Sequence, residues 1–208
     1  MPDVRAATRD DIELLARIAA AGFHDDPVFK WVFPDPAARL PQLRLVFGSM
    51  ARDMLPDGGV VHLVDDACAA CWRTPDHQHG RTAGDRVQDE GSGDAAGSPF
   101  PDDVLERLGI LGFAMVEAHP HEPHWYLNVV STFPERQGQG LGSRVLRPVL
   151  TMCDDDVQPA YLESTNPRNM SLYRRHGFEE TGRIDLPDGP SLHQMWRLPG
   201  SQSSRRHR

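Results

Sequence analysis

The chain has 208 residues, 39% of them hydrophobic, which suits one domain built around a single large core. Its formal net charge of -8 disfavours nucleic acid as a partner, because nucleic-acid binders need a basic face. There is no apolar run of about 18 residues that would indicate a membrane span, and the N-terminal MPDVRAATRDD has no signal-peptide core. We therefore expect a cytoplasmic location, with no membrane and no nucleic acid as partner.

The first third of the chain predicts one strand, three helices and a strand pair. Thr8, with Asp11 three residues later, has the capping-box pattern that begins a helix, and an apolar helical stripe follows it. In chain order we expect a strand at 3–8, helices at 9–23, 24–36 and 37–55, and antiparallel strands at 59–65 and 67–74 joined by a tight Asp-Asp turn.

Cys68 and Cys71 have the spacing of a redox or zinc motif, but they fall on a predicted strand. Residues three apart on a strand point to opposite faces, so we expect buried free thiols instead. With Cys153 there is no second cysteine pair to complete a zinc site. The prolines in HPHEPH break regular ligand geometry there, so we expect no metal.

Between residues 76 and 102 the composition becomes rich in Gly, Ser, Asp and Pro and nearly free of large apolar side chains. We interpret this stretch as a flexible polar insertion in one domain that spans residues 1–200. The basic, polar end at 201–208 is typical of a disordered tail.

The second half alternates strands and helices. We expect a helix at 103–120, a strand at 124–133, a helix at 140–155, a strand at 159–165, a helix at 170–178, and a final strand pair at 179–187 and 191–199. Pro148 inside the second of these helices is a candidate kink. This order favours a mixed α/β sheet with helices on both sides.

The stretch RQGQGLGSRVL places three glycines between a predicted strand and a predicted helix. The free N–H groups and positive dipole end of a helix bind anions, and glycine lets the backbone approach closely. The spacing fits neither the dinucleotide fingerprint nor a P-loop, so both nucleotide readings are weak. A glycine-rich turn without a ligand is the remaining alternative.

QGQGLGSRVL resembles the coenzyme A loop of the GNAT acetyltransferase superfamily, and LESTNPRNMSLYRRHGF resembles a later segment of the same superfamily. TRDD, DDPVFKWVFPD, HEPHWYL and DLPDGP are similar to the branch that contains puromycin N-acetyltransferase. The resemblance covers nearly the whole chain except the insertion and the tail. It implies a central, mostly antiparallel twisted sheet of about seven strands, flanked by helices.

The resemblance also implies acetyl-CoA as cosubstrate and a small-molecule primary amine as acceptor, in a monomer or homodimer. The backbone of residues 129–132 would pair with pantetheine, with the Val130 N–H facing the thioester oxygen. The implied cofactor-binding residues are Val129, Val130, Ser131, Thr132, Arg136, Gln137, Gly138, Gln139, Gly140, Leu141, Gly142, Ser143, Asn166, Asn169 and Tyr173. Asn166 precedes Pro167 and is also a good helix cap, so both of its roles stay open.

Tyr173 is the implied general acid for the departing thiolate, and packing on an amphipathic helix is its alternative role. Glu163 and His124 are the candidates for the general base that takes a proton from the amine, directly or through water. Asp25 and Asp26, early in the chain, are candidates to attract a cationic acceptor. The competing hypothesis from another class is a non-catalytic acyl-CoA-binding module.

Overall fold

The computed structural model describes residues 4–77 and 98–201. Its seven strands form one sheet with the order β1-β2-β3-β4-β5-β7-β6. The strands are β1 (Val4–Ala6), β2 (Val60–Val64), β3 (Cys68–Arg73), β4 (Trp125–Thr132), β5 (Ala160–Ser164), β6 (Glu179–Asp185) and β7 (Ser191–Arg197). All neighbours pair antiparallel except β4 and β5, which are parallel, so the predicted seven-stranded, mostly antiparallel sheet is confirmed.

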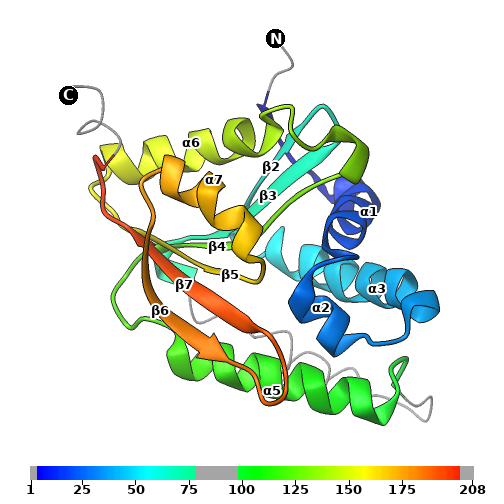
Figure 1. Ribbon diagram of the computed structural model, residues 1–208. Helices are drawn as coiled ribbons and strands as arrows, with labels where there is room; N and C mark the ends of the chain where they lie inside the picture. The colour runs from blue at the N-terminus through cyan, green and yellow to red at the C-terminus, as the bar shows by residue number, and fades with distance from the viewer. Residues whose placement is uncertain (1–3, 78–97, 202–208) are drawn as a thin grey trace.

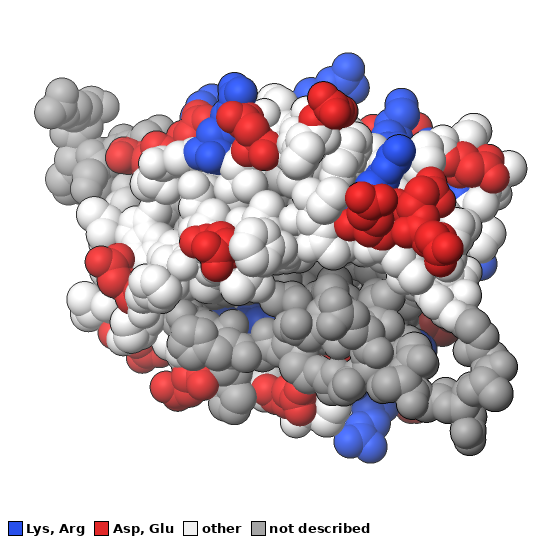
Figure 2. Space-filling model, turned by 90° about the horizontal axis from the view of Figure 1, so that it is seen from below, with Lys and Arg blue, Asp and Glu red and all other residues white. Residues whose placement is uncertain are grey.

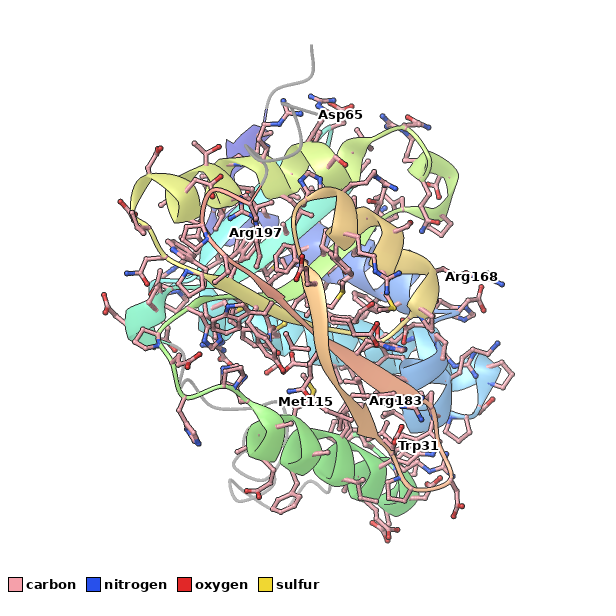
Figure 3. The ribbon with its side chains drawn as sticks, turned by 60° about the vertical axis from the view of Figure 1, so that its left-hand side comes forward. Trp31, Asp65, Met115, Arg168, Arg183 and Arg197 are labelled. Carbon is pink, nitrogen blue, oxygen red and sulfur yellow. The ribbon has the colours of Figure 1, made fainter. Side chains whose placement is uncertain are left out.

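Helices cover both faces of the sheet. They are α1 (Ile12–Phe23), α2 (Pro27–Val32), α3 (Pro36–Met54), α5 (Asp102–Ala118), α6 (Leu141–Asp155) and α7 (Met170–Arg175). One core cluster joins α1, α2, α3 and α5 to one face, and a second joins α6 and α7 to the other (Figure 1). Met115 points from α5 toward the sheet (Figure 3).

The capping box predicted at Thr8 and Asp11 is confirmed, whereas the helix predicted to begin at residue 24 begins at Pro27. The Asp11 carboxylate accepts a hydrogen bond from the Thr8 N–H at 2.8 Å, which completes the capping box. Helices α2 and α3 each begin with an aspartate cap followed by proline, at Asp26 and Asp35. Aspartate followed by proline suits the first turn of a helix, because the free N–H groups there need an acceptor and proline loses no hydrogen bond.

The strand pair β2–β3 turns at Asp65 and Asp66, which have positive φ angles of 54° and 46°, and the Ala67 N–H donates to the Val64 carbonyl at 3.0 Å to close the turn. Cys68 and Cys71 are free and buried, and they pack into the cores on opposite faces of the sheet, as predicted. Burial raises the pKa of Cys68 to about 11 and that of Cys71 to about 12. These thiols are therefore protonated packing groups.

Most of the predicted insertion at 76–102 and nearly all of the tail at 201–208 lie outside the described residues. The C-terminal end of the insertion is described, and there Phe100 is only 9% exposed. Its ring packs against Phe33, with 6.1 Å between the centroids. The insertion thus has one apolar anchor that its polar composition hides.

The surface fits the acidic composition. On the face seen from below, Asp and Glu side chains are spread over the described surface, with their largest group at the right (Figure 2). Among the described residues, no helix has the length and apolar character needed to cross a bilayer.

Candidate active site

The central feature of the sheet is a gap between β4 and β5. These strands pair only at their first residues, Trp125 with Ala160 and Tyr126 with Tyr161. Both strands are fully described, and beyond those two pairs they separate while β4 stays bonded to β3 and β5 to β7. A parallel pair that opens in this way leaves backbone hydrogen-bonding groups on the inner edges of both strands.

The backbone of β4 directs specific groups into the gap. The Phe133 N–H donates to the Ala67 carbonyl on the β3 side at 2.9 Å. Successive amides along a strand point to opposite sides, so the N–H groups of Val130 and Thr132 point toward the gap. In agreement, the Thr132 carbonyl is free of β3 and accepts a hydrogen bond from the Gln137 side chain at 3.2 Å.

The side chains of Ser131 and Thr132 are engaged with the scaffold. The Ser131 hydroxyl donates to the Ile18 carbonyl in α1 at 2.9 Å, and it leaves no room for a Cβ at Gly22. The Thr132 hydroxyl donates to the Cys68 sulfur at 3.1 Å. At these two positions only the backbone is available to a ligand in the gap.

The glycine loop leads from β4 into α6. Gly138 and Gly140 have φ angles of 75° and 77°, in the left-handed region that favours glycine. Gly140 is the residue before the helix, and no side chain caps the helix there. The first intrahelical bond runs from the Arg144 N–H to the Gly140 carbonyl at 3.2 Å, so the N–H groups of residues 141–143 have no intrahelical partner.

The polar side chains of the loop hold its shape. Arg136 donates to the Gln139 side chain at 3.0 Å and forms an ion pair with Asp65 at 3.2 Å. Gln137 is bonded to Thr132, as described above. The structure therefore places these predicted phosphate contacts at the loop, where part of their hydrogen-bonding capacity already fixes its conformation.

Tyr173 lies on α7, is 6% exposed and packs edge-on against Phe178 with 6.1 Å between the rings. Burial, and after it the nearby Asp26 carboxylate, raises the pKa of Tyr173 above its usual value. The phenol therefore keeps its proton at neutral pH, as a proton donor must.

The two asparagines before Tyr173 differ in surroundings. Asn166 caps a short 3-10 turn, η4 (Pro167–Asn169), by accepting from the Arg168 N–H at 3.1 Å. Asn169 is exposed at the start of α7. Arg168 points away from the body of the molecule (Figure 3). The capping role of Asn166 is thus directly visible, while contacts of either asparagine with a ligand stay a prediction.

The predicted acceptor carboxylates have different environments. The Asp25 side chain is 86% exposed, beside His24. Asp26 is buried, where one oxygen accepts from the Val28 N–H at 2.9 Å and the other from the Thr165 hydroxyl at 2.7 Å. Burial raises the pKa of Asp26. This carboxyl joins α2 to the end of β5, a structural role that the sequence did not indicate.

Glu163 lies in the middle of β5, and its side chain is only 1% exposed. Residues two apart on a strand share a face, so Glu163 and Tyr161 point together toward α5, away from α6 and Tyr173. Burial, reinforced by the charge of Glu163, raises the pKa values of Tyr126 and Tyr161. The Glu163 carboxylate lies 3.7 Å from Nδ1 of His119, and the phenols of Tyr126 and Tyr161 also hydrogen-bond to it.

His124 belongs to the same cluster and is fully buried. Its Nδ1 lies 2.7 Å from the Glu122 carbonyl oxygen, and its ring centroid is 4.9 Å from that of His119 and 5.3 Å from that of Tyr161. The structure therefore brings Glu163 and His124 together, and adds His119, which was considered only as part of a metal-like histidine run. Within residues 4–77 and 98–201, no three His, Cys, Asp or Glu side chains form a group suited to a metal ion.

A family described as Acetyltransferase (GNAT) matches residues 64–178 of this chain, from the end of β2 to Phe178. Mycothiol acetyltransferase of Jonesia denitrificans is 29% identical over 110 residues, which are 51% of this chain. The matched stretch is 29% of the length of that relative, so this chain spans under a third of it.

Solved structures share the fold over almost the whole chain. A structure from Corynebacterium glutamicum, described as histone acetyltransferase HPA2 and related acetyltransferase, is 26% identical with a TM-score of 0.68, covering 96% of this chain and 97% of its own. A polyamine N-acetyltransferase of Drosophila melanogaster, which forms N-acetylagmatine, is 16% identical with a TM-score of 0.57. That match covers 95% of this chain and 100% of the fly enzyme, and it shows the fold alone.

Proposed function

Because this chain belongs to the acetyltransferase (GNAT) family, we propose that it transfers the acetyl group of acetyl-CoA to the primary amine of a small molecule. The observation that carries the proposal is the gap between β4 and β5, which opens beside the uncapped N-terminus of α6. A gap bordered by backbone groups suits an extended amide chain, and a free helix N-terminus suits a phosphate. Pantetheine and pyrophosphate are joined in that order in coenzyme A.

In this proposal the protein holds acetyl-CoA mainly through its backbone. The first N–H groups of α6 and the loop at Gly138 and Gly140 bind the pyrophosphate, and the gap edge of β4 pairs with the pantetheine amides. The Val130 N–H points into the gap, where it donates to the thioester oxygen as negative charge develops. Backbone donors fixed by a sheet need no reorganisation during the reaction.

The acid and the base lie on opposite faces of the sheet. Tyr173, on the α7 face, gives its proton to the sulfur of the departing thiolate. Glu163, on the α5 face, supplies the negative charge that draws the proton from the acceptor ammonium, directly or through a neighbour. The gap connects the faces, so in this proposal the acetyl carbon lies between the acid and the base.

The acceptor is a small-molecule amine. An aminonucleoside-like acceptor, and membership of the branch that contains puromycin N-acetyltransferase, stay predictions, as do a cytoplasmic location and a monomeric or homodimeric state. Of the two aspartates predicted to attract the acceptor, Asp25 is free enough for this role, whereas the Asp26 carboxyl is already bonded through both oxygens.

The test is thiol release from acetyl-CoA in the presence of a panel of amines, with the acetylated product identified by mass spectrometry. We expect release that depends on both substrates and saturates with at least one primary amine. A control without amine measures spontaneous hydrolysis. If the folded protein binds CoA but acetylates no amine in a broad panel, it is an acyl-CoA-binding module and the proposal of an enzyme is wrong.

A further inference from the structure

We propose that His119 and Glu163 act as a carboxylate–imidazole pair in which Nε2 of His119 removes the proton from the acceptor ammonium. The inference rests on the proposed function and names the group that touches the amine. Glu163 is then a positioning residue, which acts through the imidazole.

The first argument is the distance between the two side chains. His119 Nδ1 lies 3.7 Å from Glu163 Oε1, which is ion-pair range and slightly longer than a hydrogen bond. Catalytic hydrogen bonds are often long in a free enzyme and tighten when the substrate binds. Because the Glu163 side chain is 1% exposed, its charge needs a partner inside the protein. The phenols of Tyr126 and Tyr161 hydrogen-bond to this carboxylate, and a proton on Nδ1 of His119 adds a further donor.

The second argument is the state of the other imidazole nitrogen. Nε2 of His119 is buried and has no hydrogen-bond partner among the described residues. Neutral imidazole carries one proton, so a proton on Nδ1 toward Glu163 leaves a lone pair on Nε2. A buried acceptor without a partner is destabilising, and a donor such as an ammonium group would offset that cost. The same arrangement, with a carboxylate fixing the tautomer of a histidine, makes imidazole a base in other enzymes.

The third argument is the location of the ring. The rings of Tyr126 and Tyr161 meet that of His119 edge-on, with centroids 4.9 Å and 5.4 Å away, and His124 packs beside it. Tyr126 and Tyr161 are the last pair before β4 and β5 separate. His119 directly follows α5, so its ring lies on the α5 face where the gap begins. A base held there faces the end of the gap opposite to the glycine loop.

The proposed acetyl transfer releases one proton to solvent overall. Nε2 of His119 takes a proton from the ammonium, and the free amine attacks the thioester carbonyl to form the C–N bond. As the C–S bond breaks, Tyr173 protonates the thiolate and is restored by the second proton that the nitrogen loses. The imidazolium, paired with Glu163, then gives its proton to solvent. Imidazole is better matched than a carboxylate to this transfer near neutral pH.

Titratable groups from β4, β5 and the segment before β4 face the ring of His119. They are Glu163 and Tyr161 from β5, Tyr126 from β4 and His124 just before β4. Burial keeps both phenols protonated, so the negative charge in this set is that of Glu163.

The experiment measures kcat/KM against pH for the parent, His119→Asn, Glu163→Gln and the double variant, with the exposed His121→Gln as matched control. We expect the parent activity to fall on the acid side near the ordinary imidazole range, at about pH 6–7. His119→Asn should lose about 10²–10⁴-fold with unchanged affinity for CoA. Glu163→Gln should also lose activity, because the imidazole of His119 then loses the carboxylate that fixes its orientation. The double variant should be about as slow as the slower single one, because the two residues act as a unit.

Two results would overturn the pair. One is a folded His119→Asn with parental kcat/KM, and the other is a parent whose acid limb lies in the carboxylate range, which is measured even if no variant folds. A His121→Gln variant as slow as His119→Asn would also contradict it, because the loss would then not be specific. If the parent protein transfers no acetyl group to any amine, the proposed function is refuted as well. If the parent is active and His119→Asn has the parental kcat/KM, only this inference is refuted.

Discussion

Gly140 offers the sharpest test of the cofactor site. Its φ of 77° lies in the left-handed region, and a Cβ there would meet nothing within 4 Å. A side chain therefore costs backbone energy alone, roughly 1–2 kcal/mol, with no packing clash. For a domain of this size the expected fall in Tm is about 2–8 °C. Gly140→Ala measures that cost in isolation and serves as the matched control.

Gly140→Glu carries the same backbone cost and adds a negative charge at the positive end of α6. The favourable field at a helix N-terminus is worth up to about 2 kcal/mol for an anion, and the glutamate both occupies that field and repels the phosphates. A loss of about 2 kcal/mol corresponds to roughly 30-fold in affinity. We therefore expect Gly140→Glu to bind CoA roughly 30-fold more weakly than Gly140→Ala.

Calorimetric titration with CoA and with pantetheine, which lacks the pyrophosphate, separates the two parts of the site. Gly140→Glu should lose affinity for CoA and match Gly140→Ala for pantetheine, since β4 is untouched. Thermal melts should place the two variants close together. Equal affinity of both folded variants for CoA would refute the argument that the N-terminus of α6 binds phosphate.

Three further changes test other parts of the structure. Tyr173→Phe should lower turnover about 10²–10⁴-fold with acetyl-CoA affinity unchanged, and parental turnover would make Tyr173 a packing residue. Burial raises the pKa of Asp26, so as pH rises above about 3.9 the unfolded chain ionises first and folding is disfavoured. Asp26→Asn, which can still cap α2, should therefore gain stability over the parent in urea melts as the pH rises above about 3.9, with the exposed Asp25→Asn as matched control. Asp154→Asn should cost about 3 kcal/mol in the same melts, because it leaves the fully buried Arg197 unpaired, and a loss below about 1 kcal/mol would contradict this.

The parts of the molecule that could be predicted from the sequence depend on residues close together in the chain. The capping box at Thr8 and the hairpin turn at Asp65 are local, and so is the glycine loop, whose two left-handed residues both proved to be glycines. A binding site made of backbone groups requires particular residue types only where the backbone dihedral angles are unusual. Glycine is therefore the main signal of such a site in the sequence.

The acceptor side could not be predicted in the same way. His119 follows α5, while its partner Glu163 comes from β5 and the rings around it from β4 and β5. No spacing in the sequence relates these positions, because only the sheet brings them together. The sequence likewise did not indicate the hydrogen bond that the Asp26 carboxylate accepts from the Thr165 hydroxyl, because Thr165 lies far along the chain.

Strand β4 contains a bulge of one extra residue. This bulge lets β4 pair with β3 while its other edge stays available to a ligand. The Trp125 N–H donates toward β5, to the Pro159 carbonyl, whereas the Phe133 N–H donates toward β3. These residues are an even number of positions apart, so in a regular strand both amides would point to the same side. The extra residue, Asn128, stands where the β3–β4 register shifts and reverses the alternation. Without it the Val130 N–H would face β3 and not the gap, so deletion of Asn128 should abolish acetyl transfer even if the sheet still forms.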